Sequence, residues 1–110
     1  MNCLIVDDDQ LICTLLSHFC SKVTEIESIS TANSGFEAIH LINNNRFDVI
    51  FLDFNLPDLT GREMVKIIPK ETPVIMITSN KEFAAESYAF ENILDYLVKP
   101  INFDRFFQAV

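Results

Sequence analysis

Aspartates that follow two short apolar segments are the residues of this sequence with the clearest capacity for chemistry. Leu4–Val6 leads into Asp7–Asp9, and Val49–Leu52 leads into Asp53. Two carboxylates about 4 Å apart repel by roughly 4 kcal/mol at an effective dielectric near 20, so a cluster of them favours a hard divalent cation with oxygen ligands. Mg²⁺ is the natural candidate. The alternative is that the triplet only caps the following helix, and the triplet alone does not decide between the two.

The segments that must position these carboxylates alternate in type along the chain. Short runs of apolar residues, many of them β-branched or aromatic, predict buried parallel strands at Leu4–Val6, Val49–Leu52, Val74–Ile77 and Tyr96–Val98. Glu25–Thr31 mixes polar and apolar residues, which is typical of an exposed edge strand. We interpret it as the second of five strands.

Apolar residues at helical spacing lie between the predicted strands. They are Leu11, Ile12, Leu15, Leu16 and Phe19, then Phe36, Ile39 and Ile42, then less regularly Phe83, Ala84 and Phe90, and finally Phe103, Phe106, Phe107 and Val110. Strands that alternate with helices predict an α/β fold, an open parallel sheet with right-handed crossovers and helices on both faces. Ligands of such sheets bind beyond the carboxyl ends of the strands, where the strand order reverses. The aspartates of both segments converge there if the first and third strands are neighbours.

Length and charge limit the classes of function. A chain of 110 residues with 49% hydrophobic residues predicts a single domain over residues 1–110. Its net charge of -8 repels a phosphate backbone, so we expect no nucleic acid as a direct partner of this chain. The first residues carry no basic group and their apolar run stops at Asp7, so the sequence predicts neither a signal peptide nor a membrane span. We expect a cytoplasmic protein without a membrane partner.

The cysteines and histidines have simpler interpretations. Cys3, Cys13 and Cys20 form no Cys-x-x-Cys pair, and we interpret them as reduced thiols buried in a strand and along one helix face. His18 and His40 fall in helical patterns far from the aspartates, and we expect them to be exposed.

The segment around Asp53, which runs Phe-Asp-Val-Ile-Phe-Leu-Asp-Phe-Asn-Leu-Pro-Asp-Leu-Thr-Gly, closely resembles the phosphoacceptor region of response-regulator receiver domains. Four further segments resemble that family in the same order along the chain: Leu4–Asp9, Ala32–Ala38, Thr78 and Tyr96–Pro100. The resemblance therefore covers the whole chain. It implies a doubly wound, flavodoxin-like sheet of five parallel strands in the order 2-1-3-4-5.

The resemblance also implies a role for each acidic residue. Asp53 is the phosphoacceptor, which receives a phosphoryl group from the phosphohistidine of a partner histidine kinase. Asp8 and Asp53 bind Mg²⁺ directly together with the backbone carbonyl of Asn55, and Asp7 acts mainly through a metal-bound water.

Further residues carry the catalytic and switching roles of the family. Lys99 adds positive charge to the transferring phosphoryl group, and Thr78 binds a phosphoryl oxygen through its hydroxyl, so Asp53, Thr78 and Lys99 form the catalytic set. Movement of Thr78 lets Tyr96 turn into the vacated space, which makes a two-state switch. In this family the bond before Pro100 is cis, which aims Lys99 at the site.

Two positions depart from the family pattern. Ser79 stands where receivers commonly carry Ala or Gly, and Pro69 follows Gly61 closely enough to predict a short third helix. Because of Ser79, the resemblance does not predict the lifetime of the phosphorylated state. Because of Pro69, it does not predict the shape of the surface around the third helix.

Three classes of function follow from these patterns. The ending Pro100–Val110 resembles receivers that precede LytTR-type DNA-binding domains, so we favour a transcription regulator whose last helix is truncated and whose output domain is absent from this chain. The second class is a stand-alone receiver that acts by protein contact. The third is an enzyme, either an aspartate phosphohydrolase or a flavin protein. The phosphohydrolase requires an acid two residues after the nucleophile, where this chain has Asn55. The flavin protein requires a phosphate-binding loop, which the sequence lacks. We interpret the chain as a signalling domain and not as an enzyme.

The predicted last helix bears on assembly. We expect Phe103, Phe106, Phe107 and Val110 to face inward, and Asp104, Arg105 and Gln108 to face outward beside the fourth helix and fifth strand. Receivers commonly dimerise through that surface, so a homodimer is a possible partner state.

Overall fold

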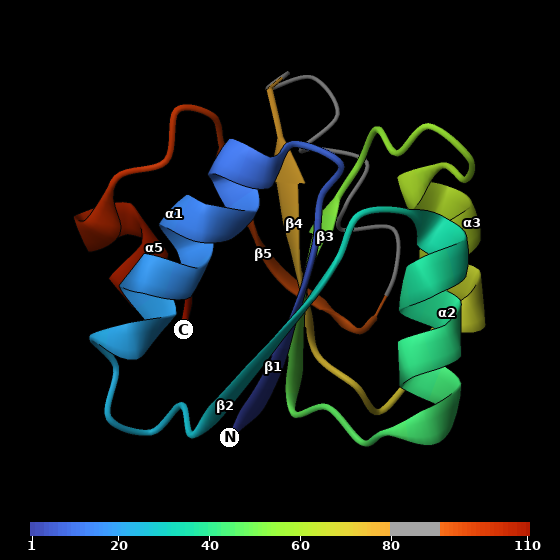
Figure 1. Ribbon diagram of the computed structural model, residues 1–110, viewed down its shortest axis with the longest axis horizontal. Helices are drawn as coiled ribbons and strands as arrows, with labels where there is room; N and C mark the ends of the chain where they lie inside the picture. Colours follow the sequence, from blue (N-terminus) through green and yellow to red (C-terminus); the bar gives the residue numbers. More distant parts are fainter. Residues whose placement is uncertain (80–90) are drawn as a thin grey trace.

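The computed structural model describes residues 1–79 and 91–110 and shows one parallel sheet between two layers of helices (Figure 1). The strands are β1 (Asn2–Val6), β2 (Ser28–Ala32), β3 (Val49–Asp53), β4 (Val74–Thr78) and β5 (Ile93–Val98). The helices are α1 (Gln10–Ser21), α2 (Gly35–Asn44), α3 (Gly61–Ile67) and α5 (Phe103–Ala109). The helical pattern of Phe83, Ala84 and Phe90 lies outside the described residues.

The strand order β2-β1-β3-β4-β5 confirms the predicted fold, with β1 directly beside β3. Every residue of β3 and β4 is buried, as the continuous apolar runs of these strands require. β2 lies at an edge and is only partly buried, which confirms the interpretation of its mixed sequence. It begins at Ser28, later than predicted, because the chain first turns at Val23, whose carbonyl accepts the Ile26 N–H at 3.1 Å.

Figure 1 shows α1 and α5 on one face of the sheet and α2 and α3 on the other. Each face has its own apolar core. Phe51, Leu16 and Phe106 belong to the core under α1 and α5. Leu52, Met64 and Ala38 belong to the core under α2 and α3. Alternate residues of one strand therefore serve opposite layers, because neighbouring side chains of a strand point to opposite faces.

The apolar stripes of the helices are narrower than the sequence pattern predicts. Leu11 is 79% exposed and Phe36 is 66% exposed, so the prediction was wrong for these two residues. Residues of one helical turn point in different directions, about 100° apart, so Leu11 faces away from the sheet while Cys13 in the same turn is buried. Cys13 and Ala38 are fully buried instead.

The inward stripe predicted for α5 also needs correction. Phe106 is fully buried, whereas Phe107 is 56% exposed and Val110 is 38% exposed. Successive residues of a helix are about 100° apart, so Phe106 and Phe107 cannot both face the sheet. Arg105 does not simply face outward either. It is half-buried, and its guanidinium donates to Asp95 Oδ1 at 2.6 Å and Oδ2 at 3.1 Å.

The predictions for the cysteines, the histidines and the third helix are confirmed. The three cysteines are free, buried thiols, and His18 and His40 are exposed. α3 is short, at 7 residues. Within residues 1–79 and 91–110, no helix has the length and apolar composition needed to cross a membrane.

Candidate functional site

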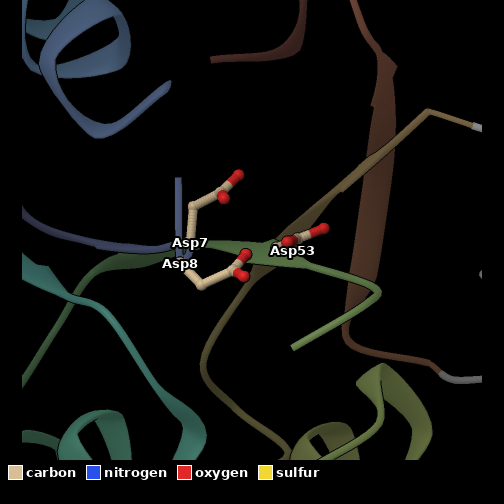
Figure 2. A group of neighbouring side chains, drawn as sticks. All are labelled: Asp7, Asp8 and Asp53. Atoms are coloured by element: carbon tan, nitrogen blue, oxygen red, sulfur yellow. The ribbon is translucent and has the colours of Figure 1, made fainter. Parts of the chain in front are cut away.

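Adjacent strands bring the aspartates of β1 and β3 together at the carboxyl edge of the sheet. Val6 is paired with Leu52, so the residues that follow β1 lie beside Asp53 at the end of β3. Figure 2 shows the carboxyl groups of Asp7, Asp8 and Asp53 gathered there. Each offers one oxygen within 4.8 Å of the others. The predicted convergence is therefore present in the structure.

The three aspartates after β1 make different contacts. Asp9 is the N-cap of α1, and its Oδ1 accepts the Leu11 N–H at 2.9 Å. Asp7 and Asp8 belong to the carboxylate cluster. The capping interpretation is therefore confirmed for Asp9, which lies directly before the first turn of α1, whereas Asp7 and Asp8 are left for the predicted cation site.

Asp7 is fully buried beside a lysine. Its Oδ1 accepts the Asp9 N–H at 2.8 Å, and its Oδ2 lies 3.1 Å from the Lys99 ammonium nitrogen. This Oδ2 is buried and accepts no hydrogen bond from residues 1–79 or 91–110. The Lys99 ammonium also lies 4.0 Å from Asp53 Oδ1.

Asp53 is 4% exposed, and its surroundings oppose ionisation. Burial raises the pKa of Asp53 to about 7, and the negative charges of Asp7 and Asp8 act in the same direction. The Lys99 ammonium and the Asn55 N–H, which donates to Asp53 Oδ1 at 3.2 Å, counteract that rise in pKa. A cation at this position would favour the ionised form.

The remaining candidates stand at the ends of β4 and β5. Thr78 is the last residue of β4 and is buried, and its carbonyl accepts the Lys99 N–H at 2.8 Å. The Lys99–Pro100 peptide bond is cis, the isomer that the resemblance implies. Tyr96 is half-buried on β5, where it pairs with Met76, two residues before Thr78 on β4.

Asn55 lies on the loop between β3 and α3. It is exposed and forms an antiparallel bridge with Thr60, the N-cap of α3. Thr60 and Glu63 form a reciprocal capping box, which begins α3 at Gly61. The loop is thus closed directly after the strand that carries Asp53.

The site fits a hard divalent cation. Asp7, Asp8 and Asp53 present converging oxygen atoms, one of which is buried without a hydrogen bond from the described parts of the chain. Lys99 contributes one positive charge, which is fewer than the three negative charges that these carboxylates carry when all are ionised. Oxygen donors and excess negative charge are what Mg²⁺ selects in proteins.

A family model described as the response regulator receiver domain matches residues 3–110. The chain belongs to this family. The receiver domain is 35% identical over 101 residues to the transcriptional regulatory protein BtsR of Escherichia coli K12, a match that covers 90% of this chain and 42% of BtsR. It is 34% identical over 113 residues to the transcriptional regulatory protein LytR of Staphylococcus aureus, covering 100% of this chain and 46% of LytR.

Solved structures agree with the family assignment. The receiver domain superposes on the chemotaxis response regulator CheY4 of Vibrio cholerae with a TM-score of 0.85 and 32% identity, covering 99% of this chain and 98% of CheY4. It superposes on the Francisella response regulator 1452 receiver domain with a TM-score of 0.82 and 32% identity, covering 98% and 92%. The receiver domain spans less than half the length of the curated relatives it matches.

Sequence reasoning missed one residue near the site. Asp58 accepts hydrogen bonds from the first turn of α2, 22 and 23 residues away in the sequence. A local pattern carries no signal for a contact at that separation. The Asp in a Leu-Pro-Asp turn shows only that a carboxylate is available.

Proposed function

We propose that Asp53 of this receiver domain accepts a phosphoryl group from the phosphohistidine of a partner histidine kinase, with Mg²⁺ bound at the neighbouring carboxylates. The observation that carries the proposal is the convergence of Asp7, Asp8 and Asp53 beside the Lys99 ammonium. In the proposed reaction, an Asp53 oxygen bonds to phosphorus while the bond from phosphorus to the histidine nitrogen breaks. The electron pair returns to the imidazole, and an acyl phosphate remains on Asp53.

The residues around Asp53 have distinct proposed roles. Asp8, Asp53 and the backbone carbonyl of Asn55 hold the ion, and Asp7 contacts it through a water. Bound Mg²⁺ supplies positive charge to the phosphoryl oxygens. Lys99 adds a second positive charge to those oxygens. Because charge on the equatorial oxygens dominates phosphoryl transfer, positioning these groups is most of the catalysis.

Thr78 and Tyr96 are the proposed switch. Thr78 ends β4 beside the site, and its hydroxyl donates to a phosphoryl oxygen in this proposal. Thr78 then moves toward the phosphoryl group, and Tyr96 on the adjacent strand turns into the space that is vacated. The pairing of β4 with β5 supports this coupling, since Thr78 is paired with Val98, two residues beyond Tyr96.

Labelling with a small phosphodonor tests the phosphoacceptor. Acetyl phosphate with Mg²⁺ should add one phosphoryl group to the wild-type chain, measured by intact-mass spectrometry. Asp53→Asn should remain unlabelled, because the amide is not a nucleophile of comparable strength. Equal labelling of Asp53→Asn and wild type would place the phosphoacceptor at another residue.

The output of the whole protein is a separate proposal. BtsR and LytR are transcriptional regulators, and the receiver domain matches less than half of each. These relatives support a DNA-binding output in a longer protein, while the net charge of -8 opposes DNA binding by this chain itself. A stand-alone receiver that signals by protein contact is the alternative. Sequencing the gene beyond codon 110 distinguishes them: a basic domain supports the first and a stop codon the second.

A further inference from the structure

Asp58 connects the loop between β3 and α3 to the start of α2 through two hydrogen bonds. Its Oδ1 accepts the Gly35 N–H and its Oδ2 accepts the Phe36 N–H, both at 2.9 Å. A helix leaves its first N–H groups without internal partners, and its N-terminus attracts negative charge. The next N–H of this turn, that of Glu37, donates to Ser34 Oγ at 3.1 Å. Asp58 therefore completes the capping of α2 from a distant part of the chain.

Close packing supports the same contact. A Cβ atom at Gly35 would lie 2.8 Å from Leu59 Cδ1 and 3.0 Å from Leu59 Cβ, so glycine permits the loop and α2 to approach this closely. The loop is also closed at its base, where Asn55 bridges to Thr60 and the Gly61 N–H donates to the Phe54 carbonyl at 2.9 Å. Asp58 and Asn55 therefore lie in one short closed loop, so a displacement of Asp58 should also displace Asn55.

The connection between β2 and α2 also holds the opposite side of the carboxylate cluster. The Asp7 N–H donates to the carbonyl of Ala32, the last residue of β2, at 3.1 Å. α2 begins three residues later, at Gly35. One short connection thus anchors both Asp7 and the loop that carries Asn55.

We propose that Asp58 is a positioning residue for the metal site, because its contact with α2 keeps Asn55 beside the carboxylate of Asp53, to which the Asn55 N–H donates. This inference rests on the proposed function, which assigns the Asn55 carbonyl as a ligand. The hydrogen bonds from Gly35 and Phe36 hold the pKa of Asp58 below its usual value, so the doubly accepting carboxylate persists at neutral pH.

Metal titration of matched variants tests the inference. Asp58→Ala should weaken Mg²⁺ binding about tenfold, the lower end of the effect of residues that orient a ligand. Ser34→Ala is the control, since it also removes a capping hydrogen bond from α2, and among the described residues the Ser34 hydroxyl forms no hydrogen bond with the loop. It should retain wild-type Mg²⁺ affinity. Asp58→Asn keeps one acceptor oxygen and should give an intermediate affinity. Amide chemical shifts in NMR spectra report the binding.

Hydrogen exchange of the metal-free chain gives an independent measurement. The Gly61 N–H, which closes the loop, should exchange faster in Asp58→Ala than in Ser34→Ala. Labelling of Asp58→Ala by acetyl phosphate should be slow at low Mg²⁺ and approach the wild-type rate at saturating Mg²⁺.

The outcomes separate the two proposals. If wild type binds Mg²⁺ and is labelled on Asp53, but Asp58→Ala matches Ser34→Ala in Mg²⁺ affinity, the positioning role is wrong and the proposed function stands. If wild type neither binds Mg²⁺ nor is labelled, the proposed function fails and the role of Asp58 fails with it.

Discussion

Identical residues in the stretch after β1 acquire different properties from their surroundings. Asp7 is fully buried beside Lys99, Asp8 is exposed within the cluster, and Asp9 caps α1. Their side-chain chemistry is the same, so their order along the turn determines what each contacts. This division makes neighbouring aspartates suitable controls for one another.

Asp8→Ala should remove Mg²⁺ binding and phosphorylation together, because it deletes an exposed carboxylate that is assigned as a direct ligand. Asp9→Ala should bind Mg²⁺ with unchanged affinity and lose only the helix cap, at a cost of about 1 kcal/mol in the free energy of unfolding. NMR titration with Mg²⁺ and urea denaturation measure the two effects. Unchanged affinity in Asp8→Ala would contradict the assigned ligand set.

The raised pKa of Asp53 predicts how pH affects the metal-free chain. The pKa is about 7 in the folded state, whereas an unperturbed aspartate has a pKa of 3.8, so between these values the folded state holds a proton that the unfolded state has lost. Stability conferred by this group is therefore lost as pH rises from about 4 to about 7. The free energy of unfolding of wild type, relative to Asp53→Asn, should fall across that window.

Urea denaturation in a chelator at several pH values measures this difference. Subtracting the Asp53→Asn curve removes the contributions of other carboxylates, such as Asp95, whose pKa is lowered by Arg105. Mg²⁺ should oppose the loss, since a bound cation favours ionised Asp53. A difference that does not change with pH would show that Asp53 titrates as an ordinary aspartate.

Among the elements, α5 joins the core mainly through Phe106, with Phe103 packed against the same core. The ring centroid of Phe106 lies 5.4 Å from that of Phe51 in β3 and 5.5 Å from that of Phe19 in α1. Phe107 contacts Phe103 within α5, at 5.8 Å, and is mostly exposed. Phe106 therefore connects three elements, whereas the stacking of Phe107 on Phe103 stays within one helix.

Phe106→Ala should lower the free energy of unfolding by about 3–5 kcal/mol, because it removes a fully buried ring and leaves a cavity between Phe51 and Phe19. Phe107→Ala is the matched control and should cost less than about 1.5 kcal/mol, the upper value for one aromatic pair. Chemical denaturation of both variants measures the difference. Equal losses would mean that α5 packs in another orientation.

Across the molecule as a whole, net charge and an apolar surface act against each other. Each chain carries a charge of -8, which opposes association. Leu94 on β5 and Phe107 on α5 are more than half exposed and favour it. Of the surface predicted for dimerisation, the described part is β5 and α5.

We expect beryllofluoride, a phosphoryl mimic, to increase self-association modestly, because the proposed movement of Thr78 and Tyr96 repacks this surface. Raising the salt concentration should strengthen the dimer by screening the charge of each chain. Sedimentation with and without beryllofluoride measures both effects, and Thr78→Ala should blunt the first. Identical sedimentation in both states at high concentration would indicate that the output acts through another face of the domain.

Local patterns in the amino-acid sequence predicted the strands, and the family resemblance added where the aspartates meet. Continuous apolar runs identified β1, β3 and β4, and a mixed run identified β2 as an edge strand, because burial on one or both faces of a sheet leaves a local signal. The prediction of a buried strand was wrong for β5, which lies at the other edge and is only partly buried. The convergence of Asp53 with the aspartates after β1 also followed, since parallel strands end at one edge and the family resemblance made β1 and β3 neighbours. The roles assigned to these residues are still predictions.

Tertiary packing decided which of several similar residues makes a given contact. Phe106 rather than Phe107 enters the core. The Asp58 contact with α2 joins residues more than 20 positions apart. Such choices depend on the angles at which helices meet the sheet and on close packing between distant segments, and neither quantity is encoded in the spacing of residues along one element.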